Sequence, residues 1–330
     1  MTDPLTFAAT VLAQTPSEIP PLQPTPPIQH CQATISELKP LRLMSQRLQT
    51  DIRPDSSFTP VEFSQPSSLA PRSGSQLYRQ RLVALKAGHL YTRLSSDSYR
   101  AVWSRARKQP SYKEWRILLA KEARAAARGQ GSNRLNVLLG DSLSLWFPGE
   151  GLPQKQFWLN QSLSGDTTAH ILRRLSFFAE TRPSVIYLMA GINDLKKGAS
   201  DNQVLWNLRQ IVRRLQQSHP SAQIVVQSIL PTRSAQFSNE RILQLNQKLE
   251  AIAQQENAFF LDLYPYMADT EGNLHPNLTT DGIHLNAKGY ATWQTALLQA
   301  DQWIAMGVLK SARKRNTYDK SAIALRNQRE

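Results

Sequence analysis

From residue 134 onwards, short apolar runs alternate with longer stretches in which apolar residues recur at three- or four-residue spacing. A short apolar run predicts a buried strand, and the longer spacing predicts a helix. The predicted strands cover 135–139, 157–159, 185–189, 224–229 and 259–263, and the predicted helices cover about 166–180, 201–217, 238–255 and 287–306. Because parallel crossovers place helices on both faces of a sheet, this alternation predicts one α/β domain with three layers over residues 134–309.

Residues 76–133 are predicted to form a basic helical segment in front of this domain. The clearest helix begins after Pro110, where Ser111 and Glu114 have the spacing of a capping box. We expect the apolar stripe of this helix to pack on the domain that follows, and its basic face to stay in solvent. The stripe consists of Trp115, Leu118, Leu119, Glu122 and Ala126, and the basic face of Lys113, Arg116, Lys121, Arg124 and Arg128.

The first 75 residues hold 12 of the 20 prolines and show no apolar periodicity, which predicts a disordered Pro-rich linker. The apolar run at 7–13 is a weak match to a signal peptide, but no basic residue precedes it and Asp3 is the first charge. No apolar run approaches the roughly 20 residues of a membrane-spanning helix. The cytoplasm is therefore the default expectation. The single cysteine, Cys31, excludes an intramolecular disulfide framework and a Cys-based zinc site.

The net charge of +14 is unevenly distributed along the chain. Residues 76–134 hold 14 basic and 3 acidic residues, and the basic tail 310–330 holds 7 and 2. By contrast, residues 135–309 hold 13 basic and 14 acidic residues, so the charge says nothing about the chemistry of the α/β domain. The basic segment suggests peripheral contact with an anionic membrane, while nucleic acid is a less expected partner.

Two polar clusters directly follow predicted strands, where parallel sheets gather reactive groups. In Gly140-Asp141-Ser142-Leu143, we expect Ser142 to open a helical turn with its backbone N–H free to donate. In the cluster after the next strand, Gly165 lets a ligand approach the backbone closely. Taken alone, a serine in this position is more often an ordinary helix N-cap.

Two further clusters supply an amide and an imidazole. Asn193 follows the strand predicted at 185–189 and could direct its amide at an oxyanion, although a turn asparagine is the structural alternative. Asp281 precedes His284 by three residues, so its carboxylate could hold one ring proton and leave the other nitrogen as a base.

In this order, the four clusters resemble the SGNH/GDSL hydrolase family over about residues 134–306. The resemblance implies a flavodoxin-like sandwich of five parallel strands. It implies that Ser142 is the nucleophile, His284 the general base and then acid, and Asp281 the orienting carboxylate. The oxyanion hole would consist of the backbone N–H groups of Ser142 and Gly165 and the amide of Asn193. Ester or thioester hydrolysis by this set needs no metal or organic cofactor.

The substrate class is left open by the sequence. A lipase, lysophospholipase-type enzyme or general esterase is favoured, and a carbohydrate O-acetylesterase is the alternative. The apolar residues Leu143, Leu145, Trp146 and Phe147 could line an acyl pocket, but packing in the core is favoured. A non-enzymatic adaptor that binds membrane or nucleic acid through the basic helices is the alternative of another class, and the complete set of clusters argues against it.

Overall fold

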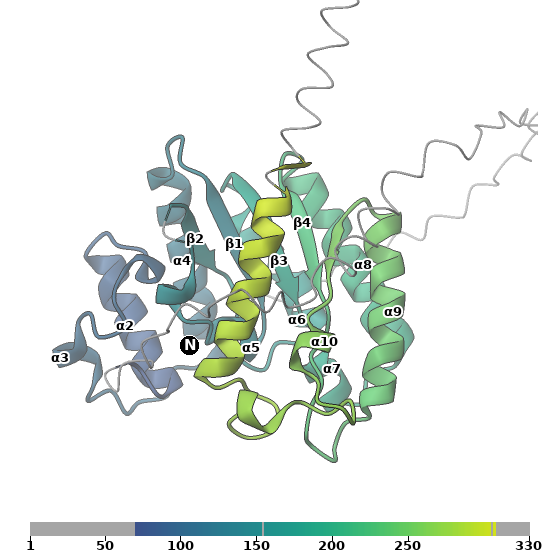
Figure 1. Cartoon of the computed structure of the whole chain (residues 1–330). Helices are drawn as coiled ribbons and strands as arrows, with labels where there is room; N and C mark the ends of the chain where they lie inside the picture. The colour runs from purple at the N-terminus through teal and green to yellow at the C-terminus, as the bar shows by residue number, and fades with distance from the viewer. Residues whose placement is uncertain (1–69, 154, 305, 308–330) are drawn as a thin grey trace, which may run out of the picture. The chain divides into compact units, whose positions relative to one another are not determined.

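The computed structural model describes residues 70–153, 155–304 and 306–307 (Figure 1). The predicted disordered linker lies outside these residues except for its last six positions, and the predicted basic tail 310–330 lies outside them entirely. None of the described helices is long and apolar enough to cross a membrane.

The five predicted strands form one parallel sheet in the order β2-β1-β3-β4-β5. They are β1 (Leu135–Gly140), β2 (Phe157–Asn160), β3 (Pro183–Met189), β4 (Gln223–Gln227) and β5 (Phe259–Leu261). This order is that of flavodoxin-like folds, whose ligand crevice lies where β1 and β3 diverge at their carboxyl ends. The predicted flavodoxin-like fold is confirmed.

Both β4 and β5 end two residues earlier than the apolar runs predict, because side chains take over the backbone hydrogen bonds there. The backbone N–H of Ile229 donates to Asn246 Oδ1 at 2.8 Å. The N–H groups of Leu263 and Tyr264 donate to Ser228 Oγ at 2.8 and 3.0 Å. These residues stay buried without continuing the ladder.

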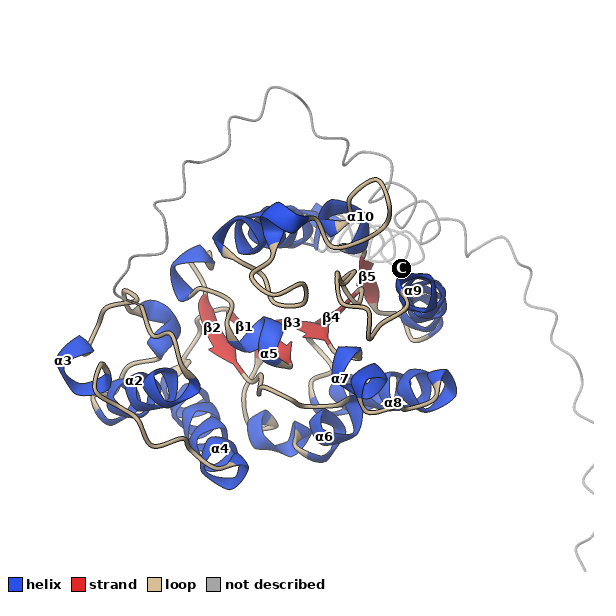
Figure 2. Cartoon of the chain, turned by 90° about the horizontal axis from the view of Figure 1, so that it is seen from below, coloured by secondary structure: helices blue, strands red, loops and turns tan. Residues whose placement is uncertain are grey.

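Helices cover the two faces of the sheet (Figure 2). Alternate strand side chains belong to two separate core clusters, one on each face. One face packs on α4 (Tyr112–Gly129), α6 (Thr168–Arg173), α8 (Asp201–Ser218) and α9 (Asn239–Gln255). The other packs on α10 (Tyr264–Met267) and on the last helix, residues 287–304, which is yellow in Figure 1. Every residue of β1 is buried, as expected for a central strand covered on both sides.

The helix predicted over 166–180 is broken in two. It consists of α6 and the 3₁₀ helix η4 (Leu175–Phe178). At Arg174 the backbone N–H bonds to the carbonyl of Ile171, three residues back, which tightens the turn and ends the α-helix.

The segment before the domain contains α2 (Gly74–Lys86), η2 (Tyr91–Arg93), α3 (Arg100–Trp103) and α4. The predicted capping box of Ser111 and Glu114 is present at the start of α4. The predicted apolar stripe is buried against the domain, and the five basic residues of the opposite face are exposed. The predicted contact of this face with an anionic membrane stays a prediction.

An ion pair that the sequence analysis missed lies inside this segment. Arg81 Nε and Nη2 donate to Glu122 Oε1 and Oε2 at 3.0 and 2.5 Å, and both side chains are buried. Arg81 Nη2 also donates to the carbonyl of Asn160 at the end of β2, at 2.8 Å. The pair therefore ties α2 and α4 to the edge of the sheet. Glu122 on an otherwise apolar stripe was the available signal, because a buried carboxylate requires a partner.

Candidate functional site

Ser142 lies directly beyond the carboxyl end of β1, as the first residue of α5 (Ser142–Leu145). Asp141 caps this helix, with its Oδ1 accepting the N–H of Leu143 at 3.0 Å. At Gly140, any Cβ atom would collide with the carbonyl oxygen of Met189 on β3, so only glycine fits where the two strands approach each other this closely. As a first-turn residue, Ser142 has a backbone N–H without an intrahelical acceptor.

His284 lies beside Ser142, and Asp281 lies beside His284. More than a hundred residues of sequence separate Ser142 from this pair. Ser142 Oγ is 3.1 Å from His284 Nε2, and His284 Nδ1 is 2.8 Å from Asp281 Oδ2. With the ring proton on Nδ1 facing the carboxylate, Nε2 is left to accept the hydroxyl proton of Ser142. The structure thus brings three predicted site residues into one hydrogen-bonded chain.

The turn around Asp281 fixes the position of the imidazole. Asp281 Oδ1 accepts the backbone N–H groups of Ile283 and His284 at 3.0 and 2.8 Å. Partial desolvation raises the pKa of Asp281, but the hydrogen bonds from His284 and Ile283 outweigh it, and the net shift is downward. The side chains of His284 and Asp281 are 41% and 53% exposed, so this pair opens to solvent.

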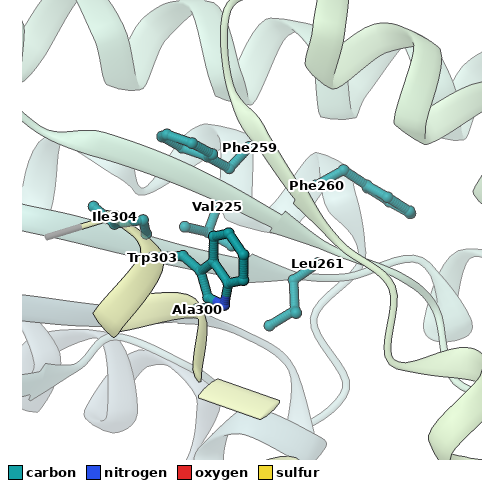
Figure 3. Close-up of a pocket in the computed structure, with 7 residues that line it drawn as sticks. All are labelled: Val225, Phe259, Phe260, Leu261, Ala300, Trp303 and Ile304. Atoms are coloured by element: carbon teal, nitrogen blue, oxygen red, sulfur yellow. The ribbon is translucent and has the colours of Figure 1, made fainter. Parts of the chain in front are cut away.

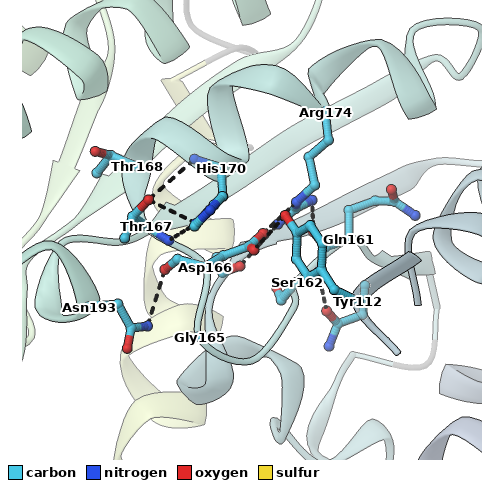
Figure 4. A network of polar contacts seen from close by, with 12 residues as sticks. Tyr112, Gln161, Ser162, Gly165, Asp166, Thr167, Thr168, His170, Arg174 and Asn193 are labelled. Atoms are coloured by element: carbon cyan, nitrogen blue, oxygen red, sulfur yellow. Dashed lines mark hydrogen bonds and ion pairs between the residues drawn. The ribbon is translucent and has the colours of Figure 1, made fainter. Parts of the chain in front are cut away.

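The other two predicted site residues lie together on the loops after β2 and β3 (Figure 4). Gly165 has φ +79°, in the left-handed region that favours glycine. Asn193, on α7 (Ile192–Lys196), donates from Nδ2 to the carbonyl of Asp166 at 3.1 Å. A primary amide carries two N–H bonds, so one of them holds this loop and the second is available to a ligand.

A buried network behind Gly165 was not predicted. Arg174 Nε donates to Asp166 Oδ2 at 2.6 Å, and both side chains are almost fully buried. The same guanidinium donates to the carbonyls of Gln161 and Gly140, at 2.5 and 3.2 Å. Tyr112 donates from its hydroxyl to Asp166 Oδ1 at 3.0 Å (Figure 4). This network joins the loop of Gly165 to the turn before Ser142.

The sequence analysis gave Asp166 no role in the site. The cap of α6 is the neighbouring Thr167, with its Oγ1 accepting the N–H of His170. The sequence carries no local signal for this ion pair, because Arg174 lies eight positions from Asp166 and the contact depends on how the loop after β2 folds.

Two further aspartates beside the site are buried. Asp194, next to Asn193, accepts hydrogen bonds from the backbone N–H and the side-chain hydroxyl of Thr168, at 2.8 and 2.6 Å. These two bonds fix the start of α6. Burial raises the pKa of Asp141 to about 7, although the N–H of Leu143 opposes this shift.

Within the described ranges, no three His, Cys, Asp or Glu side chains cluster as metal ligands would.

A cavity of about 540 Å³ opens beside His284. Trp146 is half-buried and lines it, whereas Leu143 is buried in the core and does not line it, as the packing interpretation predicted. Leu145 and Phe147 are also buried in the core, yet both reach the cavity wall. A much smaller apolar cavity of about 20 Å³ lies between β5 and the last helix, and none of the predicted site residues lines it (Figure 3).

Known proteins resemble the chain over this domain. Residues 127–292, half of the chain, match the model of the GDSL-like lipase/acylhydrolase family. Platelet-activating factor acetylhydrolase IB subunit alpha1 of Homo sapiens is 29% identical over 169 residues, which is 47% of this chain and 69% of the relative. The Pongo abelii protein of the same name is 28% identical over 170 residues, 47% of this chain and 70% of the relative.

A solved platelet activating factor-type protein from Streptococcus pneumonia has the same fold. It superposes with a TM-score of 0.52 at 24% identity, over 57% of this chain and 93% of that protein. The family match covers all five residues predicted for the site, and it confirms the resemblance inferred from the four clusters. The chain belongs to the GDSL-like lipase/acylhydrolase family and is an ester-hydrolysing enzyme.

Proposed function

We propose that the protein hydrolyses carboxylic esters through an acyl-enzyme on Ser142. His284 acts as the general base and then as the general acid, and Asp281 orients its ring. The observation that carries this proposal is the hydrogen-bonded chain from Ser142 Oγ through His284 to Asp281. Such a chain activates a serine hydroxyl, which is otherwise a poor nucleophile at neutral pH.

In the first half-reaction, Nε2 of His284 takes the proton of Ser142 as Oγ bonds to the acyl carbon. The carbonyl oxygen becomes an anion and accepts hydrogen bonds from the N–H groups of Ser142 and Gly165 and from the free N–H of Asn193. Each such donor stabilises the transition state by roughly 3 kcal/mol. The bond to the alcohol oxygen then breaks, and His284 gives that oxygen its proton.

In the second half-reaction, water takes the place of the alcohol. His284 accepts a proton from the water as it attacks the acyl carbon, and then returns a proton to Ser142 Oγ as the acid leaves. Asp281 supports both steps, because its pKa is held below the ordinary value and the carboxylate remains ionised to face the imidazolium.

Esters with apolar, lipid-type groups suit this site better than acetylated sugars. The cavity beside His284 is lined mainly by apolar and aromatic side chains, among them Leu94, Trp146 and Phe147. A carbohydrate O-acetylesterase would bind the sugar hydroxyls through polar groups, and polar side chains such as Gln80 and Ser95 are the smaller part of this lining. The relatives named above are acetylhydrolases, which supports acetyl as one of the acyl groups removed.

The test is a panel of esters given to the wild type and to Ser142→Ala. The panel contains p-nitrophenyl acetate, butyrate and decanoate, together with an acetylated xylose. We expect the wild type to hydrolyse p-nitrophenyl esters, and Ser142→Ala to lose at least about 10³-fold in kcat while remaining folded. Ser176→Ala, at an exposed position of η4, is the matched control and should keep full activity. Undiminished turnover by Ser142→Ala, or activity confined to the acetylated sugar, would contradict the proposal.

A further inference from the structure

The cavity beside His284 has one wall that lies outside the part of the chain matched by the family model. Residues 70–72, residues of α2 and the turn at 91–96 form this wall. Residues 145–150, Thr280, residues 284–286 and the start of the last helix form the rest. Its volume of about 540 Å³ falls within the roughly 300–1,000 Å³ typical of small-molecule sites.

This wall is fixed to the domain by hydrogen bonds. Thr92 Oγ1 donates to the carbonyl of Trp158 on β2 at 2.6 Å. The backbone N–H of Ser96 donates to Glu150 Oε1 at 2.7 Å, which joins the turn to η3 (Gly149–Gly151). The cavity is therefore a built feature of the folded chain, with walls held in place from both sides.

The position of the cavity identifies which part of an ester it can receive. In the proposed mechanism, the carbonyl oxygen faces Gly165 and Asn193, and the leaving oxygen faces Nε2 of His284, which protonates it. His284 lines the cavity, whereas Ser142, Gly165 and Asn193 are not among its lining residues. In Figure 2, α5 lies between α2 on one side and α6 and α7 on the other. The leaving alcohol therefore points toward the cavity.

We infer that the segment before the family domain supplies a binding pocket for the alcohol half of the ester, and that esters of a bulky, apolar alcohol are the preferred substrates. This inference rests on the proposed function. It specifies that the apolar group of the substrate belongs to the alcohol half of the ester. Leu94, half-buried in the turn and lining the cavity, is the specificity residue that it assigns. Trp146 lines the cavity too, directly after the helix of Ser142.

Two isomeric esters test this assignment. Octyl acetate and ethyl octanoate contain the same atoms and leave as alkoxides of similar basicity, so the side that carries the chain is the main difference. We expect kcat/KM for octyl acetate to exceed that for ethyl octanoate by at least about 10-fold. Leu94→Trp, which fills the pocket, should remove this preference through KM. Equal rates for the isomers, or a preference for ethyl octanoate, would overturn the inference.

Two further variants separate pocket effects from folding. Leu94→Asn removes apolar contact without adding bulk and should reduce the octyl acetate preference as well. Val102→Trp adds the same indole to an exposed position of α3 that does not line the cavity, and it should keep the preference. Loss of the preference in Val102→Trp would show that bulk anywhere in the segment has the effect, and would contradict the role of Leu94.

A binding measurement distinguishes failure of this inference from failure of the proposed function. Octan-1-ol is the product alcohol, and its binding to Ser142→Ala can be measured by calorimetry without turnover. We expect saturable binding that Leu94→Trp weakens at least about 10-fold and Val102→Trp leaves unchanged. If Ser142→Ala still hydrolyses esters, the proposed function fails, and this titration alone then decides the pocket. Binding that is absent or insensitive to Leu94→Trp would overturn the pocket whatever the nucleophile.

Discussion

Tyr112, in the first turn of α4, donates its hydroxyl hydrogen to Asp166 Oδ1 at 3.0 Å, and Asp166 directly follows Gly165. The tyrosine precedes the part of the chain that the family model matches, whereas Asp166 lies inside it. The helical segment therefore contacts the loop proposed to hold the oxyanion. Arg174 completes the arrangement, because it pairs with the other carboxylate oxygen of Asp166.

We predict that Tyr112→Phe lowers kcat by about 3- to 10-fold with little change in KM. The substitution keeps the ring beside His170 and removes only the hydrogen bond to Asp166, so the loop of Gly165 loses one of its supports. Steady-state kinetics with p-nitrophenyl acetate measures the effect. Ile117→Ala, at an exposed position on the same helix, should leave kcat unchanged. An equal fall in both variants would assign the effect to α4 as a whole and not to this hydrogen bond.

Asp281→Asn tests the orientation of His284. The amide can still accept the backbone N–H of His284, but it no longer offers a negative charge to the imidazolium. We expect kcat to fall by about 10²- to 10⁴-fold while the melting temperature changes little, since the pair is exposed. The pKa of the wild-type carboxylate lies below its ordinary value, so the charge that this substitution removes is present at neutral pH. A fall of less than 3-fold in kcat would rule out this role for Asp281.

Asp141→Asn should make the protein more stable at and above neutral pH. Burial raises the pKa of Asp141 to about 7 from 3.8, so ionisation costs stability as the pH rises between these values. Among the residues that the structure describes, nothing hydrogen-bonds to its Oδ2, while an asparagine can still cap α5. We expect the variant to gain about 2–4 kcal/mol over the wild type between pH 4 and pH 7. Urea unfolding at several pH values measures this, and a gain that does not vary with pH would contradict it.

The buried pair of Arg81 and Glu122 offers a prediction for stability. Arg81→Met leaves the Glu122 carboxylate buried without its partner and should cost about 3–5 kcal/mol in the free energy of unfolding. The double variant Arg81→Met/Glu122→Met should recover most of this loss, because no buried charge remains. Urea unfolding of the two variants decides the matter. A double variant as unstable as Arg81→Met alone would show that the bond from Arg81 to the carbonyl of Asn160 matters more than the pair.

The sequence was sufficient to predict what depends on local pattern. The strands follow from apolar runs, and Ser142, Gly165 and Asn193 follow from their positions after three of them. Contacts between distant segments could not be predicted, because local pattern does not encode which surfaces meet. Tyr112 and Asp166 are 54 positions apart, and nothing in either neighbourhood specifies the other. The cavity wall at 91–96 depends likewise on how the first segment packs against the domain.

The central claim is that Ser142 is activated by His284 as the nucleophile. A fluorophosphonate reacts covalently with an activated serine, and peptide mass spectrometry locates the adduct. We predict a single stoichiometric adduct on the peptide that contains Ser142, lost in Ser142→Ala and slowed at least about 100-fold in His284→Ala. An adduct on another residue, or labelling of Ser142 that does not depend on His284, would contradict the account.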